Sequence, residues 1–106
     1  MPKYLIQGAY TIEGTKGVLK EGGSKRREAA EALAKSLGGK IEAFYFAFGE
    51  TDAFAIVDVP DNVSAAAAAL TLAASGAVHV KTTVLITPEE MDQAAKKTVS
   101  YRPPGR

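Results

Sequence analysis

The feature that most constrains the fold is the stretch from Lys40 to Val59, KIEAFYFAFGETDAFAIVDV, in which two apolar runs flank the polar segment 49–52. Aromatic and β-branched runs separated by a short segment containing Gly and Asp are typical of a β-hairpin. Side chains of a strand alternate between its two faces. On the first strand we expect Glu42, Phe44, Phe46 and Phe48 on one face, and Ile41, Ala43, Tyr45 and Ala47 on the other. Because both sets are largely apolar, both sides of the sheet must be covered.

The second strand of the hairpin and two strands outside it follow the same pattern. We expect Phe54 and Ile56 on one face of the second strand, and Ala53, Ala55, Val57 and Val59 on the other. Residues 3–10 alternate between two largely apolar sets, which predicts a first strand. Residues 77–86 are rich in Val and Thr and predict a fourth strand.

Two main helices are predicted between these strands. Ser24 is the expected N-cap of the first, in which apolar residues recur at helical spacing as far as Leu37, before Gly38 ends it. Asp61 is the expected N-cap of the second, which is rich in Ala, the strongest helix former. We expect the face of this second helix that rests on the sheet to consist of Val63, Ala67, Leu70 and Ala74.

Shorter helical segments are predicted near the two ends of the chain. Thr11 is placed to cap a short segment that stops at Gly22. Thr87, followed by Pro88 and then Glu90, has the spacing of a capping box at the start of a C-terminal helix. We expect a single domain over residues 1–98, followed by an extended Pro-rich tail over residues 99–106.

The order of elements predicts an α+β fold of the ferredoxin-like βαββαβ type, with a four-stranded antiparallel sheet and an extra C-terminal helix. In this plan both main helices cover one face of the sheet, and the other face stays bare. An apolar sheet face of that size is rarely exposed on a monomer. We therefore predict a homodimer, or a higher homo-oligomer, in which two sheets pack face to face around or beside a cavity.

Composition excludes several classes of function. The net charge of +1 lacks the strongly basic balance of a nucleic-acid-binding domain. The absence of Cys excludes disulfides and thiolate chemistry. No apolar run approaches the roughly 20 residues of a membrane span, and residues 1–10 lack the apolar core of a signal peptide. We expect a cytoplasmic protein with no nucleic-acid or membrane partner.

Three residues are candidate proton carriers, and each also has a structural interpretation. His79, the only histidine, could be a base or a haem ligand, but it has no second ligand at metal-binding spacing, and we predict neither a metal nor a cofactor. A strand histidine held by a hydrogen bond is the alternative. Asp52 is either a general base or a residue that accepts backbone hydrogen bonds in the hairpin turn. Tyr45 offers a phenol that is either catalytic or part of the packing.

The aromatic residues are the candidates for contact with a ligand. They are Tyr4, Tyr10, Phe44, Phe46 and Phe48. Each is either a core aromatic or part of the wall of an apolar pocket. No nucleotide-binding, zinc-protease or serine-hydrolase motif accompanies them.

Three segments resemble the GYD domain family, which lies within the dimeric α/β-barrel group of ferredoxin-like proteins. They are MPKYLIQGAYT, KIEAFYFAFGETDAFAIVDVPD and SGAVHVKTTVLITPEEM. Gly49 and Asp52 match the Gly and Asp of the family name, whereas Thr51 stands where its Tyr usually lies. The resemblance implies a fold and dimerisation, and the architecture is known to host several chemistries.

Three hypotheses of function remain open at this point. The first is a homo-oligomer that binds a small apolar or aromatic molecule in the barrel cavity. The second is a cofactor-independent enzyme, resembling monooxygenases or isomerases, that acts on small aromatic substrates through His79, Asp52 or Tyr45. It requires at least two of these residues at one cavity. The third is a structural protein that assembles through its sheet edges and its tail.

Overall fold

The computed structural model describes residues 1–106 as one sheet with four helices. The elements, in chain order, are β1 (Lys3–Tyr10), α1 (Ile12–Glu21), α2 (Gly23–Ser36), β2 (Lys40–Phe46), β3 (Ala53–Asp58), α3 (Asn62–Ala74), β4 (Val78–Leu85) and α4 (Pro88–Ala95). The strands pair antiparallel in the order β2-β3-β1-β4. The predicted ferredoxin-like α+β fold is confirmed.

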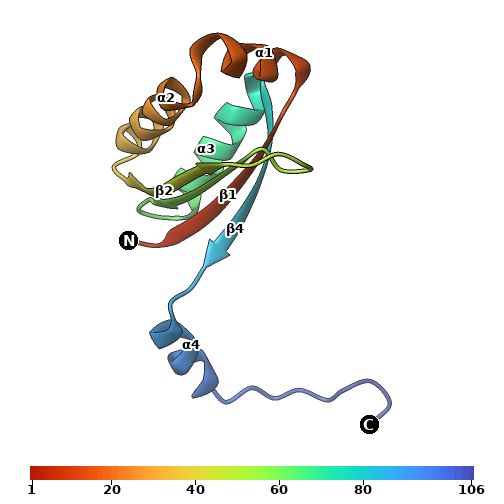
Figure 1. Cartoon of the computed structure of the whole chain (residues 1–106). Coiled ribbons are helices and arrows are strands. Elements are labelled where there is room, and N and C mark those ends of the chain that lie inside the picture. Colours follow the sequence, from red (N-terminus) through yellow and green to blue (C-terminus); the bar gives the residue numbers. More distant parts are fainter.

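Two layers form the body of the molecule, and a C-terminal segment extends away from it (Figure 1). Helices α2 and α3 lie on one side of the sheet, α2 over the edge strand β2 and α3 over the opposite edge strand β4. We call this side the helix-covered face and the other side the bare face. Beyond β4, α4 and the tail project from the body, and the extended tail ends in a turn at Pro104 and Gly105 (Figure 1).

A β-bulge in β2 changes which side chains reach the helix-covered face. Ile41 pairs with Val57, but the next pair is Ala43 with Ile56, so Glu42 is an extra residue in its strand. Ile41 and Phe44 consequently both face the helices, and Glu42 lies on the bare face. The predicted alternation was wrong for Ile41 and Glu42, because an inserted residue shifts the period of two by one position.

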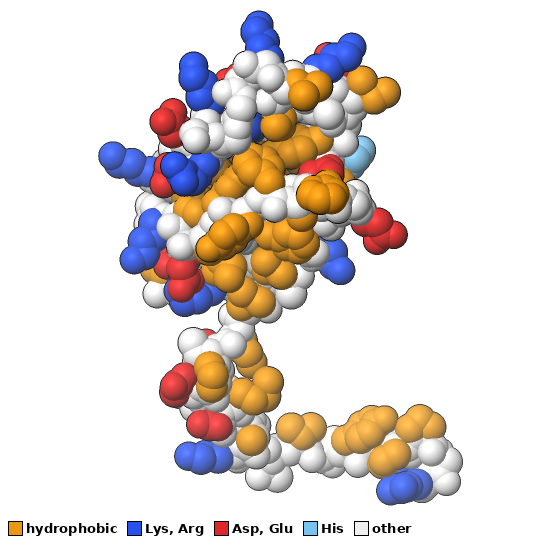
Figure 2. Space-filling view, in the orientation of Figure 1, with side chains coloured by type: hydrophobic (Ala, Val, Ile, Leu, Met, Phe, Trp, Pro, Cys, Tyr) orange, Lys and Arg blue, Asp and Glu red, His pale blue; other side chains and the backbone are white.

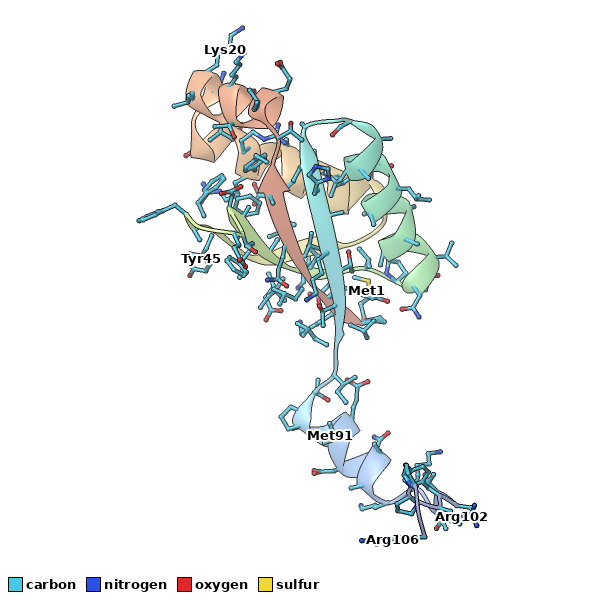
Figure 3. All side chains as sticks on the ribbon, turned by 90° about the vertical axis from the view of Figure 1, so that its right-hand side faces the viewer. Met1, Lys20, Tyr45, Met91, Arg102 and Arg106 are labelled. Carbon is cyan, nitrogen blue, oxygen red and sulfur yellow. The ribbon has the colours of Figure 1, made fainter.

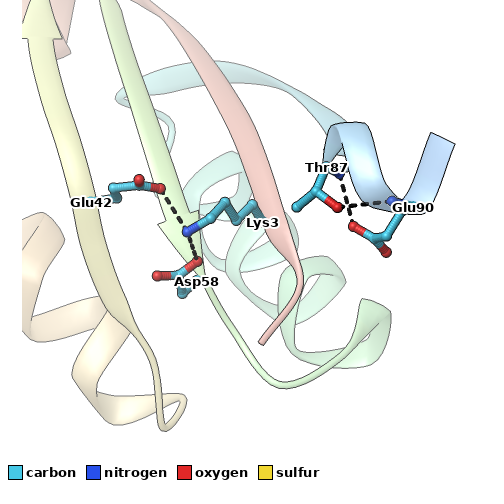
Figure 4. A network of polar contacts seen from close by, with 5 residues as sticks. All are labelled: Lys3, Glu42, Asp58, Thr87 and Glu90. Carbon is cyan, nitrogen blue, oxygen red and sulfur yellow. Dashed lines mark hydrogen bonds and ion pairs between the residues drawn. The ribbon is translucent and has the colours of Figure 1, made fainter. Parts of the chain in front are cut away.

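Capping residues set most of the helix ends as predicted. Asp61 accepts a hydrogen bond from the backbone N–H of Ser64 at 2.8 Å, and the hydrogen bonds from Ser64 lower the pKa of Asp61 below its ordinary value. Thr87 and Glu90 form the capping box of α4, with reciprocal bonds of 3.0 and 2.9 Å (Figure 4).

The predicted N-cap of α2 was wrong. The cap is Gly22, and the helix already begins at Gly23 instead of after Ser24. Gly22 has a φ of 83°, a conformation that residues with a Cβ rarely adopt. This conformation lets α1 end and α2 begin at one residue, so no side-chain cap is used.

The core lies between the sheet and α3. Its buried cluster consists of Tyr4, Ala55, Val57, Val59 and Ala65. The buried Tyr4 donates its phenolic hydrogen bond to Oδ1 of Asn62 at 2.6 Å, which ties β1 to the start of α3.

The predicted sheet-facing side of α3 was wrong. Val63 and Leu70 are 78% and 72% exposed, whereas Ala65 and Ala68 are buried. The helix is apolar all round, so its period alone does not single out one face. The small Ala side chains allow the backbone of α3 to approach the sheet closely.

The connection from α2 to β2 requires two glycines. Gly38 has a φ of 78° and ends the helix. At Gly39 a Cβ would overlap the carbonyl oxygen of Asp58, because the two backbones pass in close contact. This contact sets where β2 begins beside β3.

Substitution of Gly39 tests this contact. Gly39→Ala should lower the free energy of unfolding by about 1–3 kcal/mol, because the added methyl group forces the two backbones apart. Gly17→Ala is the matched control, since a Cβ at Gly17 in α1 meets nothing within 4 Å. It should raise the stability by up to about 1 kcal/mol through helix propensity. Urea denaturation of both variants measures the difference, and equal stabilities would contradict the close contact.

Candidate ligand-binding cleft

A cavity of about 400 Å³ opens between α2, α3 and the helix-covered face of the sheet. Of the 22 residues that line it, 18 are hydrophobic. Its volume lies within the range of about 300–1,000 Å³ that is usual for small-molecule sites. Figure 2 shows hydrophobic side chains gathered in the middle of the visible face of the body, with many of the charged side chains around the margin. We call the cavity between α2, α3 and the sheet the cleft.

The cleft exists because small residues occupy the centre of the helix-covered face. Since α2 lies over β2 and α3 over β4, the central strands β1 and β3 lie beneath the gap between the helices. These strands present Gly8, Ala53 and Ala55 to the gap, and the helices present Ala30 and Ala68. None of these side chains is large enough to fill the space, so the cleft remains open.

Few polar groups reach the cleft. Thr71 and Ser75 line it, but their hydroxyl groups donate to helix carbonyls, those of Ala67 at 2.8 Å and Leu72 at 2.6 Å. Arg26 is the only charged residue in the lining. The cleft therefore suits a ligand that is mostly apolar.

The structure distributes the predicted ligand-binding aromatic residues over different places. Phe44 and Tyr10 line the cleft, whereas Tyr4 lies in the buried core. Phe46 packs edge-to-face on Phe44, with ring centroids 5.2 Å apart, and belongs to a second, shallower hollow with Gly23. The side chain of Phe48 is fully exposed in the hairpin loop.

The three candidate proton carriers do not line the cleft. Oδ2 of Asp52 accepts a hydrogen bond from the backbone N–H of Tyr10 at 2.9 Å, while its own N–H donates to the carbonyl of Gly8 at 2.8 Å. Asp52 thus fastens the hairpin loop to β1, which corresponds to its structural interpretation.

Tyr45 and His79 lie on the bare face, on opposite edges of the sheet. Tyr45, labelled in Figure 3, is 72% exposed on β2, and His79 is exposed on β4 opposite Ala9. Three interstrand spacings of about 4.8 Å separate these edge strands. The structure therefore does not bring the two residues together at one cavity. It also contains no cluster of three or more potential metal ligands.

Fold and cleft together define a ferredoxin-like α+β domain with an open apolar cleft beneath its two main helices. The family model of the GYD domain matches residues 4–95, so the chain belongs to the GYD domain family. Searches of curated proteins and of solved structures found no match. None of the helices is long and apolar enough to cross a membrane.

Sequence reasoning did not anticipate that the cavity would lie under the helices. The relevant signal was present in the sequence. Small residues stand at core-facing positions of β1 and β3, at Gly8, Ala53 and Ala55, where large side chains would fill a core of this kind.

Two variants of Asp52 test its role in the loop. Asp52→Ala should lower the free energy of unfolding by about 1–2 kcal/mol, because the N–H of Tyr10 loses its acceptor. Asp52→Asn keeps an acceptor oxygen, so its free energy of unfolding should fall clearly less than that of Asp52→Ala. Chemical denaturation measures both, and an equal loss in the two variants would show that the carboxylate charge, not the hydrogen bond, is what matters.

Proposed function

We propose that this protein binds a small apolar molecule in the cleft between α2 and α3. The supporting observation is a cavity of about 400 Å³ whose walls are almost entirely hydrophobic. A ligand that leaves water for these walls gains about 25 cal/mol for each Å² of apolar surface buried. The packing of the two helices on the sheet forms the cleft, so little reorganisation opposes binding.

Filling the cleft tests this proposal. Ala30 lines the cleft, whereas Ala32 is exposed on the same helix and does not line it. Ala30→Phe should weaken the binding of a neutral apolar fluorophore such as Nile red at least tenfold, because the ring occupies the ligand's space. The control Ala32→Phe should bind as the wild type does. Equal binding by both variants, or no binding by the wild type, would contradict the proposal.

We also propose that two copies pair through their bare faces. Leu5 on β1 pairs with Ile56 on β3, and Phe54 lies two residues before Ile56 on the same face of β3. These side chains form an apolar patch on the bare face, and none of them is fully buried by its own chain. A two-fold axis would bring this patch onto its own copy, which is the commonest form of association between identical subunits. The family resemblance implies the same kind of assembly.

Three charged residues of the bare face, Lys3, Glu42 and Asp58, are already paired with each other. Nζ of Lys3 lies 2.8 Å from both Asp58 and Glu42 (Figure 4). Asp58 and then Glu42 raise the pKa of Lys3 by accepting its hydrogen bonds. Lys3 thus stays protonated to a higher pH than an isolated lysine, and the network joins one ammonium group to two carboxylates beside the apolar patch.

The C-terminal arm, residues 86–106, supports a second candidate function, the assembly of several copies of this chain. Figure 3 shows Met91, Arg102 and Arg106 on this arm, away from the body that carries Lys20 and Tyr45. Ile86, Met91, Val99 and Tyr101 are exposed along it. An isolated helix as short as α4, with 8 residues, is marginally stable in water. Packing of the arm on another copy would stabilise the helix and cover these side chains.

One set of lysine substitutions distinguishes the two contacts. Leu5→Lys should convert dimers into monomers, because it places an unpaired charge in the interface between the bare faces. Met91→Lys should leave that dimer intact and remove only larger species that form through the arm. Val63→Lys, on an exposed site of α3, is the control. Native mass spectrometry counts the subunits, and a monomeric wild type would contradict the dimer.

A further inference from the structure

We propose that the ligand of the cleft is an amphiphilic carboxylate whose head group pairs with Arg26. This inference rests on the proposed function and specifies its ligand. Arg26, in the N-terminal part of α2, is the only charged residue that lines the cleft. The remaining lining contains no carboxylate that would repel an anion or neutralise the guanidinium.

The guanidinium of Arg26 has no hydrogen-bonded partner within the chain. Its nearest carboxylate is that of Glu21, with Nη1 and Oε1 3.9 Å apart, which is too far for a hydrogen bond. The side chain is only 33% exposed. A guanidinium carries five N–H donors, so a largely covered Arg26 retains donors for an acceptor that enters the cleft.

A carboxylate fits this arrangement better than a neutral head group. The two oxygens of a carboxylate match the fork of a guanidinium and accept two parallel hydrogen bonds. The contact with Glu21 does not prevent this pairing, since a partly exposed ion pair without a hydrogen bond contributes little. Of the three other polar side chains in the lining, Thr71 and Ser75 already donate their hydrogens to helix carbonyls, and the third is the phenol of Tyr10.

The apolar part of the ligand would lie between the two helices. From Arg26 the lining continues along α2 through Ala30 and Leu33, and over the sheet through Ala55 and Val57. These walls offer no hydrogen-bond partner from a side chain. A hydrocarbon chain or an aromatic ring system with one terminal carboxylate therefore complements both the charge and the apolar surface.

The experiment compares decanoate with decanol, two molecules with equal chains and different head groups. Isothermal titration should show that the wild type binds decanoate about tenfold more tightly than decanol, both below the concentration at which they aggregate. Arg26→Gln should reduce the affinity for decanoate to that for decanol and leave decanol binding unchanged. The matched control Arg27→Gln removes an equal charge from the next residue, which does not line the cleft, and should retain the preference.

The outcomes separate this inference from the proposed function. Equal affinity of the wild type for both molecules would overturn the role of Arg26 and leave the apolar cleft supported. If the wild type bound neither molecule, both this inference and the proposed function would be overturned. A specific pairing with Arg26 would be refuted by either of two results. In the first, Arg26→Gln weakens the binding of decanol as much as that of decanoate. In the second, Arg27→Gln abolishes the preference for decanoate as fully as Arg26→Gln does. Restoration of the preference by Arg26→Lys would support it.

Discussion

The size of the side chains at the centre of the helix-covered face governs much of this structure. Gly8, Ala53 and Ala55 leave a shallow surface over β1 and β3, while the helices pack over the edge strands. Protein interiors are normally filled to the density of organic crystals, and an unfilled space loses the attraction of its missing neighbours. A chain that retains such a space gives up packing energy there, and occupation by an apolar molecule would restore it.

The sequence predicted the fold well because each element carried a local signal. Alternation identified the strands, and the side-chain oxygens of Asp61 and Thr87 marked two helix starts. The bulge at Glu42 was not predictable in this way, because both neighbouring faces are apolar and an inserted residue leaves the apolar content of each face almost unchanged. Where the residues at both odd and even positions of a strand are apolar, the alternation cannot show which of them face the core and so cannot fix the strand register.

The site was less predictable than the fold. Five aromatic residues were predicted to contact a ligand, yet only Phe44 and Tyr10 reach the cleft. What shapes the cleft is the absence of large side chains on neighbouring strands and helices, and that absence becomes visible only when the elements are assembled. The same holds for Arg26, which stands between Lys25 and Arg27 in a short basic run and yet has a side chain that is only one-third exposed.

The two apolar faces of the sheet have different consequences. On the helix-covered face, the chain supplies its own cover but leaves the middle open, which creates a cavity inside one subunit. The bare face carries Leu5, Phe54 and Ile56 with no element of the chain above them, so cover there requires another molecule. Strands β1 and β3 contribute side chains to both surfaces, so the proposed ligand and the proposed partner would contact opposite faces of the same two strands. A coupling between the two binding events would therefore have to pass through the backbone of these strands, since no helix lies between them.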